Sequence, residues 1–448
     1  MKHNFSKNLF ISALIPSLII WWGILIWLFD LQKILVVRTW VHQSSLARID
    51  PIIKEVHARL VTANNLRFSR PLDLIFPPPL FYRSSLPRYD LTIAPKETVK
   101  LEEKVQLAIN SATGLLTDEY NIWAPASLNY NGNTYQVKVK YRGDRVTHWN
   151  SHKKSLSIKF DNSSIPGQNN RLTLIIPEER NYLGAAFSKH VANKLGLMVQ
   201  SDDFVTASIN SEDLGLYYTT EQLDADFLQS RSRPLGNLYS DQYGNVPWSK
   251  QIQLFKNIKD WKKMVSYPSA PDDTADLERL INWVQHPISP PTMINEDSFL
   301  NWQVHSLLLG NFTQDNTHNL KLYSNPQTQQ FEFIPDDISF SSDVSSFFPY
   351  CTMFDTSYNQ LVSALLIDPK RLQQRNQILK LYLTNPQNIQ EDINYLQTQI
   401  DQLSAEFFIG EKKSTQLQVR YAMWYLPKGL NNWYKHLLQQ LESCYESN

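Results

Sequence analysis

Glycine is scarce in this sequence. Its 448 residues include 13 glycines, and the closest two, Gly236 and Gly244, lie eight positions apart. The phosphate-binding loop of many ATPases needs glycines about five positions apart, and the dinucleotide-binding fingerprint needs them closer still. If the protein binds a nucleotide, it must therefore do so without these glycine-rich loops.

Cysteine is rare in this sequence, and neither sign of charge is in excess. Cys351 and Cys444 are the only cysteines. They could form one disulfide, but they exclude a disulfide framework and a four-thiolate zinc site. The 43 Lys and Arg residues balance 43 Asp and Glu residues. The chain thus has no basic excess of the kind that marks a nucleic-acid-binding protein, and we expect no nucleic-acid partner.

One long hydrophobic run is present near the N-terminus. Residues 9–29 contain no charged side chain, and at about 1.5 Å per residue a helix of this length spans the roughly 30 Å hydrocarbon core of a bilayer. Lys2 and Lys7 precede the run and no small-residue cleavage pattern follows it, which favours an uncleaved signal anchor. We expect residues 1–30 to anchor a single-pass membrane protein, with the rest of the chain outside the cytoplasm. A buried core helix is the alternative.

Residues 31–90 are expected to connect this anchor to the folded part of the chain. Residues 50–60 begin with Asp and Pro, which favour the start of a helix. Residues 71–87 contain five prolines, which stiffen a chain. We interpret the region as a juxtamembrane helix followed by a proline-rich stalk.

Residues 91–250 have the pattern of a sheet. Apolar and polar residues alternate in 136–141 and in 156–160, as in strands that are buried on one face. Gly215 is expected to form the turn of a further hairpin. The other elements predicted in this half are a strand at 172–176, a helix at 183–197 and hairpin strands at 204–210 and 216–220.

Residues 251–448 are mainly helical in pattern. The apolar spacing predicts helices at 297–309, 359–384, 388–408 and 427–443, and a strand hairpin at 320–323 and 331–334. A sheet-rich half followed by a helical half predicts an α+β fold with two lobes.

Two segments stand out by their charge. Residues 136–160 contain seven Lys or Arg residues and one acid, Asp144, whereas residues 315–343 contain five Asp or Glu residues and one base, Lys321. Basic side chains on strands can hold phosphates, and carboxylates beside an Asn amide can hold Mg²⁺. Together they would form the two halves of a phosphoryl-transfer site. The alternative is that both segments are solvated faces.

The order of residues within the acidic segment favours the phosphoryl-transfer site. Asp315 and Asn319 are predicted on a loop between an apolar helix and a strand, with a spacing close to that of a protein-kinase catalytic loop. One hairpin later, an apolar strand ends at Asp336 and Asp337. A protein kinase carries its second metal-binding Asp at the corresponding place.

These residues resemble the spore coat protein H (CotH) kinase family, a divergent branch of the protein-kinase-like fold. The resemblance covers residues 136–443 and depends on short motifs in a fixed order. They are Arg142-Gly143, Lys153-Lys154-Ser155, Leu214-Gly215-Leu216-Tyr217 with Glu221, Leu309-Gly310-Asn311 with Asp315, His318-Asn319, and Ile334-Pro335-Asp336-Asp337. The resemblance implies an atypical kinase fold, with a sheet-rich N-lobe at 91–250 and a helical C-lobe at 251–448.

The resemblance also implies catalytic and metal-binding residues. Asp315 would be the catalytic Asp, and Asn319 and Asp337 would bind the Mg²⁺ or Mn²⁺ that accompanies ATP. Three positions depart from the family pattern. Asp144 follows Arg142-Gly143 where Asn is more usual. Asp336 stands where an aromatic residue is common, and Ser339 stands where a second Asp is common.

The nucleotide contacts are implied in the same way. Lys154 would contact the phosphates of ATP, with Lys153 and Lys159 as alternatives. Arg142 would lie in the same basic segment, and Glu221, at the end of a strand, would lie near the nucleotide.

The implied function is that of a membrane-anchored kinase. It would use ATP and Mg²⁺ or Mn²⁺ to phosphorylate a Ser or Thr hydroxyl of a protein acceptor. Two alternatives stay open: a nucleotide-binding pseudokinase, and a non-catalytic protein of the cell envelope. A pseudokinase would keep the fold without turnover, whereas an envelope protein would scatter the charged residues over its surface.

Overall fold

The computed structural model describes residues 82–111, 114–143, 146–149, 151–161, 170–242, 252–287, 291–340, 359–409 and 416–445. The predicted anchor and most of the predicted stalk lie outside these residues, so both stay predictions. Within the described residues, none of the helices has the length and apolar composition needed to cross a bilayer.

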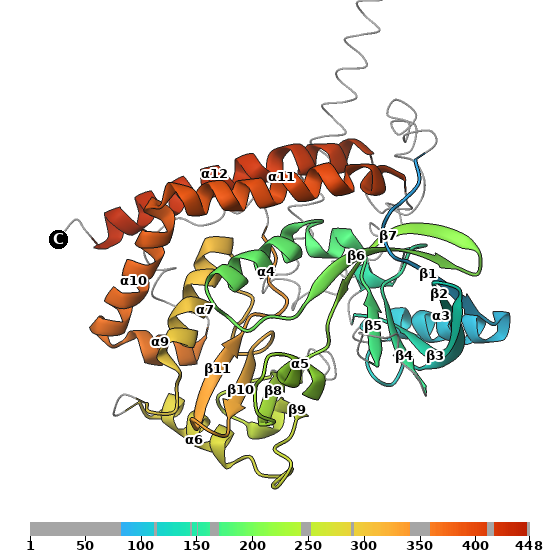
Figure 1. The fold of residues 1–448 in the computed structure, drawn as a ribbon. Coiled ribbons are helices and arrows are strands. Elements are labelled where there is room, and N and C mark those ends of the chain that lie inside the picture. Colours follow the sequence, from blue (N-terminus) through green and yellow to red (C-terminus); the bar gives the residue numbers. More distant parts are fainter. Residues whose placement is uncertain are drawn as a thin grey trace, which may run out of the picture. The chain divides into compact units, whose positions relative to one another are not determined.

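The first sheet has seven strands in the order β5-β4-β3-β2-β1-β6-β7 (Figure 1). Its strands are β1 (Arg88–Ile93), β2 (Ala124–Tyr130), β3 (Asn133–Tyr141), β4 (Leu156–Phe160), β5 (Arg171–Leu174), β6 (Asp202–Ile209) and β7 (Glu212–Thr220). The pair β1–β6 is parallel and the others are antiparallel. Ile175 and Tyr218 exchange two backbone hydrogen bonds of 2.8 Å. The two edges of the sheet therefore meet, and the sheet curls around its own core.

The apolar side chains of the alternating strand pattern form that core, as predicted. Val137, Val139 and Tyr141 of β3 are buried, whereas Lys138 and Lys140 between them lie on the opposite face. Helix α3 (Pro95–Asn110) packs into the same core through a buried stripe of apolar side chains. The interior is therefore apolar, and the cations of β3 lie outside it.

The hairpin β6–β7 differs from its prediction. Its turn is formed by Asn210 and Ser211, which have φ angles of 52° and 68°, as a two-residue hairpin turn of the mirror-image type requires. Gly215, with φ of 67°, lies inside β7 where the register shifts beside Ala207. It therefore forms a β-bulge and not the turn.

The second sheet has four strands in the order β11-β10-β8-β9. They are β8 (Asn237–Asp241), β9 (Trp261–Val265), β10 (Lys321–Asn325) and β11 (Gln330–Ile334). The pair β10–β11 confirms the predicted hairpin. β8 precedes residue 250 and the other three strands follow it, so this sheet joins segments from both predicted lobes.

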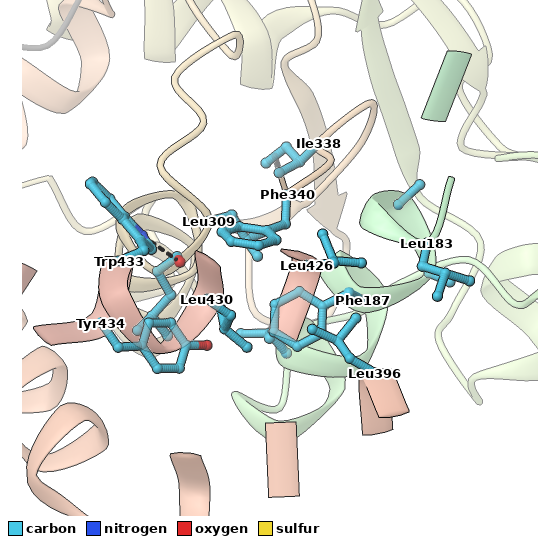
Figure 2. Packing of buried hydrophobic residues seen from close by; sticks show 14 of the residues in the cluster. Leu183, Phe187, Leu309, Ile338, Phe340, Leu396, Leu426, Leu430, Trp433 and Tyr434 are labelled. Atoms are coloured by element: carbon cyan, nitrogen blue, oxygen red, sulfur yellow. Dashed lines mark hydrogen bonds between the residues drawn. The ribbon is translucent and has the colours of Figure 1, made fainter. Parts of the chain in front are cut away.

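Helices form the rest of the described chain. Beside short helices they are α4 (Gly184–Lys194), α6 (Ala275–Gln285), α7 (Glu296–Leu309), α9 (Gln360–Leu366), α10 (Pro369–Thr384), α11 (Pro386–Ile409) and α12 (Gln416–Tyr445). Their shared core includes Phe187, Leu309 and Phe340 (Figure 2). Trp433 of α12 donates from its indole Nε1 to the carbonyl oxygen of Leu308 at 2.9 Å. α12 is thereby fastened to the end of α7, from which the predicted catalytic loop starts. Near the other end of α12, Cys444 is disulfide-bonded.

Candidate active site

The loop that follows α7 holds the predicted catalytic residue. Asp315 Oδ1 accepts hydrogen bonds from the backbone N–H groups of Thr317 (2.7 Å) and His318 (3.0 Å). It also contacts Thr317 Oγ1 at 2.7 Å and His318 Nδ1 at 2.9 Å. Asp315 Oδ2 makes no hydrogen bond with the residues that the structure describes. The turn therefore fixes the carboxylate through one oxygen and leaves the other available.

The environment of Asp315 keeps it ionised. Burial alone would raise its pKa, but the hydrogen bonds from His318 and Thr317 lower the pKa below its ordinary value. Asp315 is therefore a carboxylate at neutral pH. A carboxylate with one available oxygen can orient a hydroxyl group and accept its proton.

Gln314 connects this loop to the end of β11. Its side chain is buried, and its Nε2 donates to the backbone oxygens of Asn319 at 3.2 Å and Asp336 at 3.3 Å. The Asp315–Asn319 loop and the carboxylates after β11 are separated by a hairpin in the sequence. The hydrogen bonds of the Gln314 side-chain amide hold the loop and the residues after β11 side by side.

Both predicted metal ligands have an unusual backbone. Asn319 has a φ of 62° and Asp337 a φ of 53°, in the left-handed region that few non-glycine residues adopt. Such residues gather at functional sites. The side-chain amide of Asn319 makes no hydrogen bond with a described residue, so its oxygen is available as a ligand. The described part of the chain contains no group of three or more His, Cys, Asp or Glu side chains that could hold a metal ion.

Asp336, the neighbour of Asp337, belongs to a buried charge network. Lys321 Nζ lies 2.9 Å from Asp241 Oδ2 and 3.4 Å from Asp336 Oδ2. Burial alone would lower the pKa of Lys321, but the charges of Asp241 and Asp336 raise it above its ordinary value. Lys321 therefore stays charged and ties Asp336 to the end of β8.

Asp337 is paired with a cation from the first sheet's side of the molecule. Arg180 follows β5 in the short helix η4 (Pro177–Arg180), and its guanidinium contacts Asp337 Oδ1. The Arg180 side chain is 17% exposed and that of Asp337 is 40% exposed. Asp337 Oδ2 remains unpaired among the described residues.

Arg142 lies in the same region without such a partner. Its guanidinium is half-buried and forms no hydrogen bond or ion pair with a described residue. Burial lowers the pKa of Arg142 to about 10, Arg180 acts in the same direction, and Asp336 opposes them. Arg142 is therefore a desolvated cation close to Arg180 and Asp336, at the junction of the two sheets.

Lys189 of α4 reaches this junction as well. Its Nζ donates to Thr220 Oγ1, at the end of β7. Burial lowers the pKa of Lys189 to about 8, and the charges acting on it include Asp202 and Asp336. Its ammonium group therefore titrates close to neutral pH.

Lys153 and Lys154, which the family resemblance implies as phosphate ligands, make contacts within the protein. Lys153 is 3% exposed, donates to the carbonyl oxygen of Leu216 and lies 4.5 Å from the centre of the Tyr217 ring. Lys154 donates to the carbonyl oxygen of Ser151 at 2.9 Å and lies 3.5 Å from Glu102 of α3. Lys153 therefore has partners in β7, and Lys154 has partners in the loop before β4 and in α3.

Lys159 belongs to a row of cations across three strands. Lys138 of β3 is directly opposite Lys159 of β4, which is directly opposite Arg171 of β5. Residues paired in this way share one face of a sheet. Lys140 is on the same face, and among the charges acting on it are Arg171 and Arg142. We call Lys138, Lys140, Lys159 and Arg171 the basic face; it extends toward Arg142.

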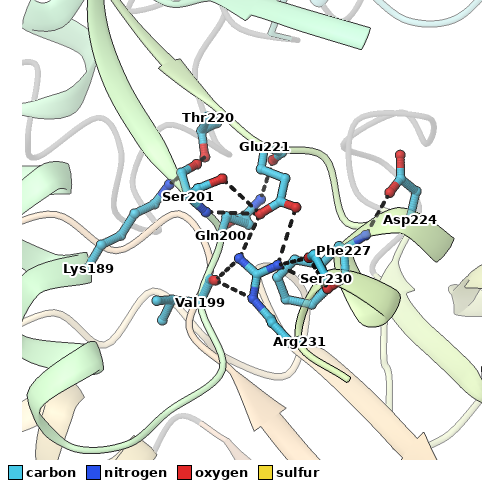
Figure 3. Close-up of polar contacts among 10 residues, drawn as sticks. All are labelled: Lys189, Val199, Gln200, Ser201, Thr220, Glu221, Asp224, Phe227, Ser230 and Arg231. Atoms are coloured by element: carbon cyan, nitrogen blue, oxygen red, sulfur yellow. Dashed lines mark hydrogen bonds and ion pairs between the residues drawn. The ribbon is translucent and has the colours of Figure 1, made fainter. Parts of the chain in front are cut away.

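Glu221 is held by protein groups, as Figure 3 shows. Arg231 contacts it with two nitrogens, at 3.2 and 2.7 Å, and Ser201 donates to it from its backbone N–H at 3.0 Å. Burial alone would raise the pKa of Glu221, but these contacts lower it. Glu221 thus stabilises the segment that leads from the first sheet to the second.

Arg180, Lys189 and Asp241 were missed in the sequence. Arg180 follows two glutamates, Lys189 lies within an amphipathic helix and Asp241 ends a short strand, so each had an ordinary local explanation. Position was a signal for two of them, because Arg180 and Asp241 are the last residues of their elements, whereas Lys189 lies in the middle of α4.

Comparison with known proteins identifies the family of this chain. The family described as CotH kinase protein matches residues 139–434, about two thirds of the chain. The chain therefore belongs to the CotH kinase protein family and is a kinase-like protein, as the sequence motifs predicted. Among solved structures it is similar to the Helicobacter pylori proinflammatory kinase CtkA, at 11% identity and a TM-score of 0.25, over 65% of this chain and 92% of that chain. No curated protein matches it.

Proposed function

We propose that this chain transfers the γ-phosphoryl group of ATP, bound with Mg²⁺ or Mn²⁺, to a Ser or Thr hydroxyl of a protein acceptor. The family membership supports a kinase-like protein, and the observation that carries the finer proposal is Arg142. A desolvated guanidinium that forms no ion pair with a described carboxylate is costly unless an anion pairs with it. A nucleotide phosphate is such an anion, and it matches the geometry of a guanidinium.

The basic face supplies further cations for the same ligand. Lys159 forms no hydrogen bond or ion pair with a described residue, and like charges directly opposite one another on a sheet are destabilising. Lys138, on one side of Lys159, lies 3.6 Å from Asp161 Oδ1, but Arg171 lies directly opposite Lys159 on the other side. The repulsion between Lys159 and Arg171 raises the energy of the protein and favours binding of an anion there. We therefore assign phosphate contacts to Arg142 and Lys159 before Lys153 and Lys154.

The oxygen atoms near Asp337 suit a magnesium or manganese ion. Mg²⁺ is usually held by one or two carboxylates together with substrate phosphates and water. Asn319 and Asp337 each have an oxygen without a partner among the described residues, and nucleotide phosphates would supply further ligands. When bound, the ion would neutralise charge on the transferred group.

We assign to Asp315 the role of orienting the acceptor hydroxyl and accepting its proton. Its ionised carboxylate is fixed by Thr317 and His318 through Oδ1, so Oδ2 can accept the proton of an incoming hydroxyl. The hydroxyl oxygen then forms a bond to the γ-phosphorus as the bond to the leaving ADP oxygen breaks. Its proton passes to Asp315.

A pseudokinase is the second candidate, and one contact favours it. Arg180 neutralises Asp337 in this structure, as a metal ion would, and Ser339 stands where the family often has a second Asp. A chain of this kind would bind a nucleotide through cations alone. Metal dependence of ATP binding distinguishes the two candidates.

The experiment is calorimetric titration of the full chain with ATP, with and without Mn²⁺. The Arg142→Ala variant should bind ATP roughly ten- to a hundredfold more weakly, because it loses a charge-assisted contact. Arg279→Ala, which removes an exposed arginine of α6, is the matched control and should bind like the wild type. Equal affinities for all three proteins would contradict the assignment. An affinity for ATP that is the same with and without Mn²⁺ would favour the pseudokinase.

A further inference from the structure

Among the described residues, Arg142 is held through its backbone and not through its side chain. Its guanidinium forms no hydrogen bond or ion pair with them, whereas its backbone N–H donates to the carbonyl oxygen of Ser155 at 2.8 Å. An arginine side chain is long and has many rotamers, so its head group is placed only as well as the backbone that carries it. The residues that fix this backbone therefore decide where the guanidinium of Arg142 meets a ligand.

Ser155 is the centre of this backbone anchor. It is fully buried. Its carbonyl oxygen accepts the Arg142 N–H, and its own N–H donates to the carbonyl oxygen of His148 at 2.8 Å. Its hydroxyl oxygen accepts the backbone N–H of Ile176 at 3.1 Å and lies 3.3 Å from His148 Nδ1. Ser155 thus connects the end of β3 to the loop that follows it and to Ile176, the residue before η4.

The ring of His148, at the end of the short helix η3 (Val146–His148), holds the turn after β3 from another side. Gly143 has a φ of 89°, and a Cβ atom at this position would overlap the His148 ring. The ring therefore packs directly on the glycine, and any larger residue there would clash with it. Thr147 Oγ1 donates to Glu179 Oε2 at 2.8 Å, and His148 Nε2 lies 3.8 Å from the same oxygen. These contacts pack the turn against η4.

Rigid contacts thus gather on a turn whose arginine side chain has no partner among the described residues. Binding sites use this arrangement, in which a group that contacts the ligand is kept in place by a second layer of hydrogen bonds. A misplacement of about 1 Å is enough to weaken such a contact strongly. The anchor also resists displacement, because breaking one of its buried hydrogen bonds leaves a desolvated polar group without a partner.

We propose that Ser155 and His148 are positioning residues for Arg142. They hold the turn from which the guanidinium reaches a nucleotide phosphate, and they affect ATP binding only through Arg142. The inference rests on the proposed function, because it takes that phosphate as the ligand of Arg142. It has a consequence that a merely structural role lacks: the loss of Ser155 or His148 weakens ATP binding only while the guanidinium is present.

The test is a double-mutant cycle on the affinity for ATP with Mn²⁺, measured by calorimetric titration of the full chain. Ser155→Ala and His148→Ala should each weaken binding roughly threefold to tenfold, which is a part of the loss in Arg142→Ala. In an Arg142→Ala background, the same two changes should weaken binding no further. Ser208→Ala is the matched control, because it removes the hydroxyl of a buried serine in β6 that donates to Asp90 at 2.6 Å. It should bind ATP like the wild type.

Two results would overturn this inference alone. One is an equal loss of affinity in the wild-type and the Arg142→Ala backgrounds, because Ser155 and His148 would then act on the fold and not through Arg142. The other is wild-type affinity in both single variants. Circular dichroism checks folding. If Ser155→Ala does not fold, His148→Ala carries the test, because the side chain of His148 is partly exposed.

A failure of the proposed function gives a different result in the same cycle. If Arg142→Ala itself binds ATP like the wild type, the assignment of a phosphate contact to Arg142 fails, and the positioning roles fail with it. If Arg142→Ala binds more weakly but the coupling to Ser155 and His148 is absent, the phosphate contact stands and only the positioning roles are wrong.

Discussion

The guanidinium of Arg180 contacts the carboxylate of Asp337, across the junction between the two sheets. Asp337 is the residue that the family resemblance implies as a metal ligand, and we propose that role for it. In this state a protein cation therefore occupies one of its two oxygens. Binding of a metal ion at Asp337 must compete with Arg180 or use the remaining oxygen.

Arg180→Ala should strengthen the binding of Mn²⁺ in the absence of nucleotide. The pair is partly exposed, so its loss is expected to change the affinity only roughly twofold to fivefold. Mn²⁺ titration followed by electron paramagnetic resonance measures this. An unchanged or weaker affinity would mean that Arg180 orients Asp337 for the metal and does not compete with it.

Asp337→Ala should abolish the dependence of ATP binding on Mn²⁺, because a ligand of the ion is lost. Asp315→Ala should leave that dependence intact, since Asp315 acts on the acceptor hydroxyl. Calorimetric titration of both variants separates the two roles. Loss of metal dependence in both would place Asp315 among the metal ligands.

The affinity for ATP should fall as the pH rises from 7 to 9. Burial lowers the pKa of Lys189 to about 8, so its ammonium group loses its charge over this range, and a positive charge at the junction is lost with it. Lys189→Arg should bind ATP equally at both pH values, because an arginine stays charged. Calorimetric titration at pH 7 and pH 9 checks this. An identical pH dependence in the wild type and the variant would exclude Lys189 as its source.

Glu221→Ala should destabilise the fold. The change leaves the partly buried Arg231 without its carboxylate, which costs about 1–3 kcal/mol. Urea unfolding followed by fluorescence measures the loss. Glu103→Ala, on the exposed side of α3, is the control and should change stability little. If Glu221→Ala is as stable as the wild type but binds ATP more weakly, Glu221 contacts the nucleotide, as the family resemblance implies.

Strand pattern was the most predictable part of this molecule. The alternation around Val137 and Val139 fixed which side of β3 is buried, and β4 matches its predicted bounds. The turn chemistry of Asn210-Ser211 was harder to predict, because Gly215 nearby offered a simpler explanation. Strand alternation explains a hydrophobic face, but it does not say which strands pair. The pairing of β8 with β10 therefore could not be predicted.

The sequence carries more information about the acidic half of the candidate site than about its basic half. Asp315, Asn319 and Asp337 are close together in the sequence, and their order on loop, hairpin and strand carries information. The cations come from separate elements. Whether a lysine can contact a phosphate depends on the direction in which its long side chain extends. Lys153 and Lys154 are sequence neighbours of the predicted strand, yet one turns into the sheet core and the other toward α3. Arg180 and Lys189 reach Asp336 and Asp337 only through the tertiary fold.

The central claim is that this chain transfers a phosphoryl group through Asp315. The most direct measurement is incorporation of label from γ-labelled ATP with Mn²⁺, using a Ser-rich acceptor protein and the chain itself as acceptors. The account predicts labelling by the wild type and by the control Asp272→Ala, and a loss of roughly 10²–10⁴-fold in Asp315→Ala with ATP binding preserved. Label incorporation that is equal in Asp315→Ala and the wild type, or absent from a wild type that binds ATP, would contradict it.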